Sequence, residues 1–179
     1  MKKPIKILAV SVLALSISLF VLSIGARISG IYINITPSLP VGFYKMVDEP
    51  IVSGAYVAFC PQQDEVFDMA IDRSYINRGN CPGGYGLLLK RVFAQSGDTV
   101  SIDQAGIFVN GKHLPNSAQL TADPEGQPLP QYRLQAVLDD AEYLLLSDLN
   151  PQSFDARYFG LIVRDQIQQV VRPVFTWSH

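Results

Sequence analysis

The pattern of apolar and polar residues divides this 179-residue chain into an apolar run and a mixed body. Residues 7–26 carry no charged side chain, and about twenty helical residues rise about 30 Å, which matches the core of a bilayer. We therefore expect residues 1–27 to form a membrane anchor or signal segment. Residues 28–179 are enough for one domain with its own core.

The charges that flank the apolar run predict its orientation. Lys2, Lys3 and Lys6 precede the run and Arg27 follows it, so we expect the amino terminus in the cytoplasm. The domain would then lie in the periplasm, beside the inner membrane. The alternative is a cleaved signal peptide, which leaves a periplasmic protein. Small residues near the end of the run permit cleavage, although such apolar regions are normally only about 7–15 residues long.

The body consists of short β-rich segments separated by turn residues. Strands are expected at residues 55–59, 87–93, 99–102, 106–109, 112–114, 142–146 and 170–175. The Asn110–Gly111 pair is the strongest hairpin signal, because both residues accept the positive φ of a type I′ turn. Residues 115–130 are expected to form a loop, and no long helical periodicity follows the anchor. The pattern predicts a mainly β domain.

The charge balance argues against one class of partner. Residues 1–27 hold four of the fourteen basic residues and no acidic one, so the rest has a net charge of −6. A domain with this charge repels the phosphate backbone, and nucleic-acid binding is not expected.

Two cysteines, Cys60 and Cys81, favour a disulfide in an exported domain. The closed loop would have about 20 residues, and the segment at residues 67–84, which has no clean period, would be an insertion clamped by the cysteine pair. A reactive thiol is less favoured, because neither cysteine belongs to a C-x-x-C pair. A metal site is no better supported, since His113 and His179 are the two histidines and neither has ligand spacing to the cysteines. No cofactor is expected.

The same two histidines disfavour a Ser-His-Asp triad, because one lies beside a turn and the other is the last residue. Lys90 is a candidate base in their place, since it lies in the apolar segment GLLLKRVF at residues 86–93. To be neutral near pH 7 its pKa must fall by about 3.4 units, roughly 4.6 kcal/mol, which desolvation can supply. The alternative is an edge-strand lysine whose amine reaches water.

Ser38 is the candidate nucleophile. It lies in the segment TPSLPVGFY at residues 36–44, where Pro37 and Pro40 fix their own φ angles and restrict the residue before each. A nucleophile in a stiff turn loses little entropy when it reaches its attack geometry. The alternative is a simple linker between the membrane and the domain.

A third polar segment follows at residues 146–160. Ser153, Asp155 and Arg157 alternate, so an extended chain would place them on one face. Asp155 and Arg157 would form an ion pair, and Ser153 beside them would be a hydrogen-bond partner for a neutral lysine amine. The alternative is a polar strand face with an ordinary ion pair.

Together and in this order, the three segments resemble the type I signal peptidase family, and most closely its conjugative-transfer branch, the TraF peptidases. The matching segments are SLPVGFY at 38–44, KRVFAQSGD at 90–98, VNGK at 109–112, and SD at 147–148 with SFDARYFG at 153–160. Housekeeping members usually have Met where this chain has Leu39, and Gly-Asp-Asn where it has SDL at 147–149. These departures favour the conjugative branch.

The resemblance implies an antiparallel β-sheet domain of the signal peptidase type, with one N-terminal transmembrane helix and a serine–lysine dyad. The residues to which it assigns a role are Ser38 as nucleophile, Lys90 as general base, Ser153 as the residue that orients the lysine, Asp155 and Arg157 as a supporting ion pair, and Thr36 as an oxyanion donor.

The resemblance also implies a function. The chain would be a membrane-associated serine endopeptidase that matures a conjugative pilin precursor at the periplasmic face, by hydrolysis or with cyclisation, for plasmid transfer. Its partners would be the pilin precursor, the inner membrane and the conjugative transfer apparatus. Two alternatives stay open: a general type I signal peptidase, and a non-catalytic component of a pilus or secretion assembly.

Overall fold

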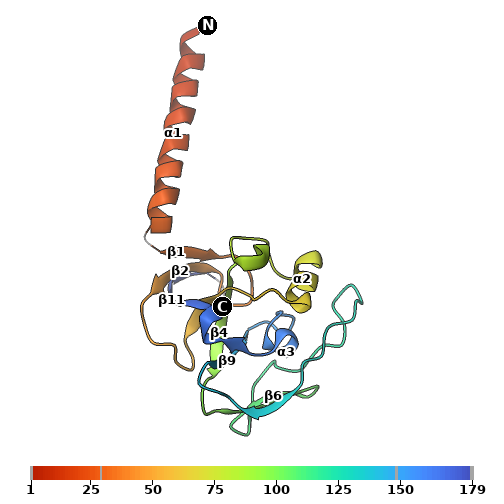
Figure 1. Ribbon diagram of the computed structural model, residues 1–179. Helices are drawn as coiled ribbons and strands as arrows, with labels where there is room; N and C mark the ends of the chain where they lie inside the picture. The colour runs from red at the N-terminus through yellow and green to blue at the C-terminus, as the bar shows by residue number, and fades with distance from the viewer. Residues whose placement is uncertain (1, 29, 148, 178–179) are drawn as a thin grey trace.

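A computed structural model describes residues 2–28, 30–147 and 149–177. A long helix, α1 (Lys2–Ile28), projects from a β-rich body, and the chain enters that body through β1 (Figure 1). Met46 N donates to Gly30 O at 2.8 Å, which ties the chain just after the helix to the body.

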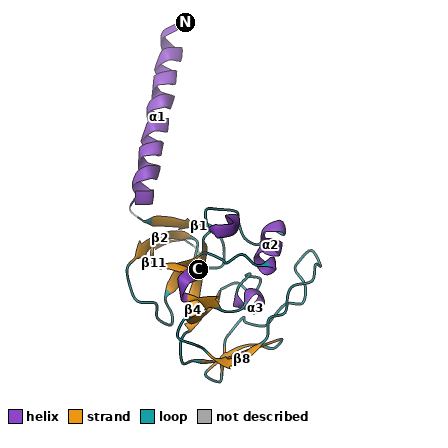
Figure 2. Ribbon diagram, in the orientation of Figure 1, coloured by secondary structure: helices purple, strands orange, loops and turns teal. Residues whose placement is uncertain are grey.

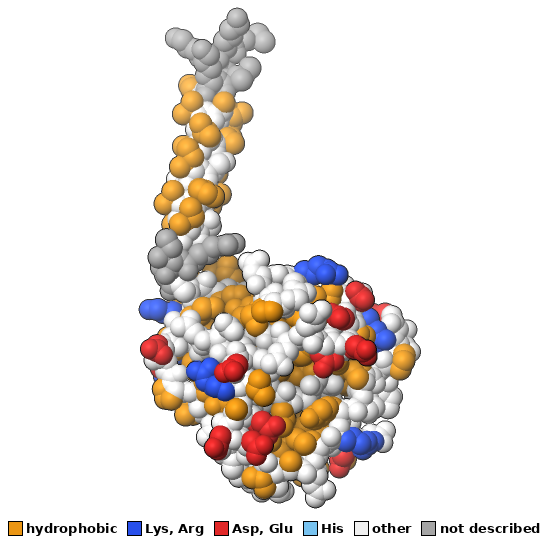
Figure 3. Space-filling model, in the orientation of Figure 1, with side chains coloured by type: hydrophobic (Ala, Val, Ile, Leu, Met, Phe, Trp, Pro, Cys, Tyr) orange, Lys and Arg blue, Asp and Glu red, His pale blue; other side chains and the backbone are white. Residues whose placement is uncertain are grey.

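Helix α1 is long and apolar enough over Ile7–Gly25 to cross a membrane. Its described side chains are exposed, and Figure 3 shows apolar groups along the visible side of the helix. Exposing such a surface to water is unfavourable by about 25 cal/mol per Å². The helix agrees with the expected apolar segment, and its properties fit both a retained anchor and a signal sequence.

Antiparallel pairing organises the body into two sheets (Figure 2). The larger sheet has the order β1 (Ile31–Asn34), β2 (Gly42–Val47), β11 (Ile167–Thr176), β3 (Tyr56–Phe59), β4 (Leu88–Ala94), β9 (Glu142–Leu146) and β10 (Ile162–Val163). The smaller sheet has the order β7 (Lys112–His113), β6 (Gly106–Val109), β5 (Thr99–Asp103) and β8 (Leu134–Val137). The expected mainly β, antiparallel fold is confirmed.

Each expected strand corresponds to an observed one, with ends that differ by up to three residues. The sequence pattern did not predict β1, β2, β8 and β10. The first two flank the proline-rich turn, whose turn residues obscured the short strands on either side. Figure 1 shows β11 beside β2, so the last strand lies next to one of the first strands of the body.

Two short α-helices and two 3-10 turns complete the body: α2 (Glu65–Asp72), α3 (Ala156–Phe159), η1 (Pro82–Gly84) and η2 (Arg164–Gln166). The side chain of Asp64 accepts from Val66 N and caps α2, which buries Phe67 and Ala70. Eight residues give only two helical turns, too few for a period to stand out in the sequence. The core between α2, α3 and the larger sheet contains Val57, Val92 and Leu145.

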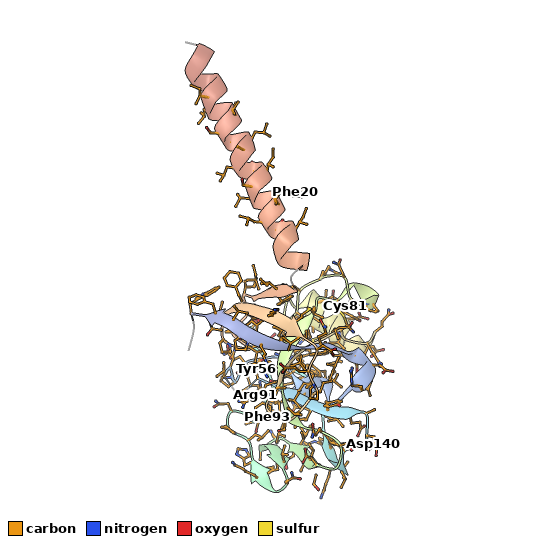
Figure 4. All side chains as sticks on the ribbon, turned by 90° about the vertical axis from the view of Figure 1, so that its left-hand side faces the viewer. Phe20, Tyr56, Cys81, Arg91, Phe93 and Asp140 are labelled. Carbon is orange, nitrogen blue, oxygen red and sulfur yellow. A yellow bond between two sulfur atoms is a disulfide. The ribbon has the colours of Figure 1, made fainter. Side chains whose placement is uncertain are left out.

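The predicted disulfide is confirmed. Cys60 at the end of β3 is bonded to Cys81, with a Cα–Cα distance of 5.4 Å. Figure 4 labels Cys81 in the part of the body nearest the helix. The bond closes the segment that carries α2, and Arg78 and Tyr85 form an isolated bridge within the same region.

Removing this cross-link with the double change Cys60→Ser and Cys81→Ser should lower stability by about 3 kcal/mol, the loop entropy expected for about 20 residues. Thermal and urea unfolding of the oxidised wild type and of the variant measure the difference. Reduced wild type is the control and should match the variant. Equal stability of all three would contradict the prediction.

Candidate active site

The turn between β1 and β2 carries Ser38 at the mouth of a cleft. Gly42 begins β2 where β11 passes close by, and a Cβ on Gly42 would lie 2.2 Å from Phe175 O. The turn is bonded to the body, since Tyr44 Oη donates to Pro40 O at 2.6 Å. Ser38 is half-buried, and its Oγ lies 2.8 Å from Ser153 Oγ. The segment is therefore part of a packed hairpin and not a free linker.

Lys90 lies on β4, between β3 and β9, and its side chain is buried. Its Nζ donates to Ser153 Oγ at 2.6 Å. Burial lowers the pKa of Lys90 to about 8, while Asp155 raises this pKa and Arg157 lowers it. The structure contradicts the alternative of an edge-strand lysine that reaches water. A substantial neutral fraction of the amine is available near pH 8.

Ser153 joins the two candidate groups, because its hydroxyl contacts both Ser38 Oγ and Lys90 Nζ. A serine hydroxyl has a single proton. When Lys90 is an ammonium it donates to Ser153, whose proton is then directed to Ser38. When Lys90 is neutral the direction reverses, and the Ser38 proton is directed through Ser153 to the amine. The arrangement suits proton removal from Ser38.

Asp155 and Arg157 form a fully buried ion pair behind Ser153. Arg157 Nε donates to Asp155 Oδ1 at 2.8 Å and Arg157 Nη2 to Asp155 Oδ2 at 2.9 Å. Arg157 also donates to Ser153 O at 2.8 Å. The predicted pairing is present, but the extended geometry behind it is wrong, because Asp155 is the N-cap of α3 and Ala156 begins that helix. The cap brings the two charges together.

Ser147 links the ion pair to the nucleophile turn. Its backbone N donates to Asp155 Oδ2 at 3.1 Å, and its Oγ donates to Ser38 O at 2.5 Å. No role was predicted for Ser147, because the spacing of residues in the sequence does not show that its hydroxyl contacts the carbonyl oxygen of Ser38. Asp148, which belongs to the matching motif, lies outside the described residues.

Thr36 is exposed, two residues before Ser38. Its Oγ1 donates to Asn34 Oδ1 at 2.9 Å. Asn34 was also missed by the sequence analysis, although a polar residue in an alternating strand, directly before the turn, was a usable signal.

A cleft of about 1290 Å³ lies against these groups. Ser38, Lys90 and Ser153 line it together with apolar residues such as Ile35 and Leu87. Residues 73–81, which end at the disulfide, and residues 123–125 of the predicted 115–130 loop also line it. The cleft is large enough for an extended peptide segment.

His113 does not line the described cleft. His113 is exposed on β7, where its ring lies 4.9 Å from that of Phe108. His179 lies outside the described residues. Within the described ranges there is no group of three or more His, Cys, Asp or Glu side chains that could hold a metal ion.

Comparisons with known proteins show what this chain is similar to. Residues 2–177 match the family described as signal peptidase, peptidase S26. A plasmid transfer protein TraF from Escherichia coli is 51% identical over 153 residues, which cover 85% of this chain and 86% of that protein. Another E. coli plasmid transfer protein TraF is 45% identical over 178 residues, 99% of this chain and 100% of that protein. A solved signal peptidase I from Enterococcus faecalis V583 has 19% identity and a TM-score of 0.38, covering 69% of this chain and 97% of its own.

The buried lysine generates a prediction about stability. Below about pH 8 both folded and unfolded chains hold the Lys90 proton, so the burial cost of about 3 kcal/mol is fully present. Between about pH 8 and 10.5 only the unfolded chain keeps the proton, so stability rises with pH. Lys90→Met should therefore stabilise the protein by up to about 3 kcal/mol at pH 7, and the gain should shrink toward pH 10.5.

Urea unfolding of the full-length protein in detergent at pH 7 and pH 10 measures this difference. Lys112→Met is the matched control, because Lys112 is exposed on β7 and its replacement should change stability by less than about 0.5 kcal/mol at either pH. A Lys90→Met protein that is less stable than wild type at pH 7 would show that the burial cost is not there.

Proposed function

The chain belongs to the signal peptidase family, peptidase S26, and from this premise we propose that it is a serine endopeptidase with Ser38 as nucleophile and Lys90 as general base. The observation that carries the proposal is the pair of contacts made by the Ser153 hydroxyl, 2.8 Å to Ser38 Oγ and 2.6 Å to Lys90 Nζ. A buried lysine with a pKa of about 8 can take the proton of a serine hydroxyl, and among the described residues no histidine lines this cleft.

The reaction begins with the neutral amine. With a pKa of about 8, roughly one tenth of Lys90 is neutral at pH 7. Ser38 Oγ attacks the scissile carbonyl carbon, and its proton passes to Lys90 Nζ through Ser153. The tetrahedral intermediate collapses, the C–N bond breaks, and the Lys90 ammonium protonates the leaving amine.

The acyl-enzyme formed on Ser38 is resolved by a second nucleophile. Water gives hydrolysis, while an amine from the substrate's own chain gives a cyclic product. The developing oxyanion is stabilised by the Ser38 backbone N–H and by the Thr36 hydroxyl, which lies two residues earlier in the turn. Ser153 orients Lys90, and the Asp155–Arg157 pair holds Ser153 in place through its carbonyl oxygen.

The proposed substrate is a conjugative pilin precursor. Support comes from the similar E. coli proteins, which are named plasmid transfer protein TraF, and the partner assembly is accordingly the conjugative transfer apparatus. A general signal peptidase would use the same chemistry on more clients. A non-catalytic assembly component is less well supported, because such a role gives no reason to bury a lysine against a serine hydroxyl that also contacts Ser38.

The proposed location is the inner membrane, with residues 1–27 as the anchor and residues 28–179 as the periplasmic peptidase domain. Exposed apolar side chains support it. Ile33 pairs with Phe43, which pairs with Phe175, and the Trp177 ring lies 5.6 Å from that of Phe43. The first three of these residues lie on β1, β2 and β11, and Trp177 directly follows β11; β1 contacts α1, and Figure 3 shows apolar side chains on the body close to the helix. Trp and Phe are common at membrane interfaces.

Ser38→Ala should abolish processing of the pilin precursor, and Lys90→Arg should be as inactive as Lys90→Ala, because a guanidinium stays protonated at any relevant pH. The wild-type rate should rise with pH through an apparent pKa of about 8. Co-expression with the pilin, followed by mass spectrometry of the pilin termini, measures processing and separates hydrolysis from cyclisation.

Lys112→Arg is the control for the lysine substitution, since Lys112 is exposed on the smaller sheet. Substantial activity in Ser38→Ala or Lys90→Arg, with wild-type amounts of folded protein, would overturn the assignment of the dyad. Cleavage of many unrelated exported precursors by the wild type would favour the general signal peptidase.

Membrane attachment should set the rate on membrane-embedded substrates. A protein that begins at Gly30 keeps the bond from Met46 N to Gly30 O and should retain the fold. It should cleave a soluble peptide that spans the pilin site at the wild-type rate. On pilin in vesicles the truncated protein should be slower, because it is not held in the membrane at the same depth as its substrate and is therefore not oriented toward the cleavage site. Equal rates on vesicles would favour a signal peptide that serves export alone.

A further inference from the structure

The buried side chain of Asn34 fills the inside of the turn that carries Ser38. Asn34 is 4% exposed and ends β1, where it pairs with Gly42 at the start of β2. Its Nδ2 donates to three carbonyl oxygens of the turn, those of Thr36 at 2.9 Å, Leu39 at 3.1 Å and Pro40 at 3.2 Å. The nucleophile lies between these anchored residues.

The other end of the same amide holds Thr36. Asn34 Oδ1 accepts from Thr36 N at 3.2 Å and from Thr36 Oγ1 at 2.9 Å. The two ends of the amide therefore meet groups of opposite hydrogen-bonding character, three acceptors on the nitrogen side and two donors on the oxygen side. This match fixes the orientation of the amide group.

The composition of the turn explains why a side chain is needed there. Pro37 and Pro40 have no N–H, so they cannot close the turn with backbone hydrogen bonds of their own. Carbonyl oxygens that are removed from water need a donor. The buried side chain of Asn34 supplies this donor, and its Nδ2 group contacts carbonyl oxygens both before and after Ser38 in the sequence.

We propose that Asn34 is the positioning residue of the nucleophile turn, fixing the backbone of Ser38 and aiming the Thr36 hydroxyl. This inference rests on the proposed function, in which Ser38 is the nucleophile. Asn34 acts through the turn and takes no part in proton transfer, since its side-chain contacts are with Thr36, Leu39 and Pro40.

The contact with Asn34 also sets the direction of the Thr36 hydroxyl. The hydroxyl of Thr36 has a single proton, which in the free protein is donated to Asn34 Oδ1. To stabilise the oxyanion, this proton must turn away from Asn34, while the bond from Thr36 N to Oδ1 holds the residue in place. Rotation of the Thr36 hydroxyl about its Cβ–Oγ1 bond is therefore enough to turn its proton from Asn34 Oδ1 toward the oxyanion.

Asn34→Asp is the sharpest variant, because it keeps the size and shape of the side chain. The new carboxylate replaces the Nδ2 donors and faces three carbonyl oxygens, so it should repel the turn. We expect the single-turnover rate on pilin precursor in vesicles to fall about 100-fold, as for a misplaced reacting group, with half-saturation within about twofold. The pH at half-maximal rate is compared in Asn34→Ala and should stay at the wild-type value, because this change adds no charge near Lys90.

Asn110→Asp is the matched control. Asn110 also uses both ends of its amide, donating from Nδ2 to Asp98 Oδ1 at 2.7 Å and accepting from Thr99 N at 2.9 Å. It lies in the turn between β6 and β7, away from the residues that line the cleft. This variant should lose stability and keep the wild-type single-turnover rate.

A double-mutant comparison tests the link to Thr36. Asn34→Ala and Thr36→Val should each reduce the single-turnover rate, and the double variant should lose less than the product of the two factors, because both act on the same donor. Factors that multiply would overturn the part of the inference that concerns Thr36.

Folding is checked by circular dichroism and by melting temperature, so that each rate refers to folded protein. A folded Asn34→Asp or Asn34→Ala variant with a rate within twofold of wild type would overturn the positioning role. Failure of both to fold, where Asn110→Asp folds, would mark Asn34 as a folding residue and also overturn it. An active Ser38→Ala variant would instead remove the proposed function on which the inference rests.

Discussion

The buried ion pair between Asp155 and Arg157 is the interaction on which the site depends. Burying two charges costs several kcal/mol per ion unless each finds further partners. Here Arg157 donates to the carbonyl oxygens of Ser153 and Pro151, and Asp155 accepts from the backbone N of Ser147. Two of these partners also contact the nucleophile, since Ser147 donates to Ser38 O and Ser153 contacts both Ser38 Oγ and Lys90 Nζ. Loss of one charge would leave the other uncompensated behind Ser153.

The same pair leaves the lysine free to lose its proton. An aspartate alone near Lys90 would favour the ammonium, and Asp155 does raise the pKa of Lys90. Arg157 acts in the opposite direction, so the two charges partly cancel at the amine. Desolvation is then the dominant effect, and it lowers the pKa of Lys90 to about 8. Because the Asp155–Arg157 pair has no net charge, it holds the loop in place without strongly favouring the ammonium form of Lys90 over the neutral amine.

The parts of the site that follow a periodic rule could be predicted from the sequence. Lys90 stands in an apolar strand segment, and its burial follows from its position between β3 and β9. The Asp155–Arg157 pairing was predicted from an extended chain, whereas the structure produces it through a helix cap. Ser147 could not be given a role, because it acts on a backbone carbonyl oxygen, whereas for Asn34 the sequence offered one signal, a polar residue in an alternating strand. Which carbonyl lies near a polar side chain depends on the folded path and not on residue spacing.

The position of the nucleophile turn also follows from the path of the chain. β1 begins three residues after α1 ends, and Ser38 lies four residues beyond the end of β1. The hairpin of β1 and β2 therefore carries both the nucleophile and the exposed apolar side chains that lie near the helix. In the proposed reaction, any tilt of this hairpin relative to the bilayer would move Ser38 with it. A rigid turn then serves two purposes. It presents the Ser38 hydroxyl to Ser153, and it keeps this hydroxyl at a constant depth for substrates held in the same membrane.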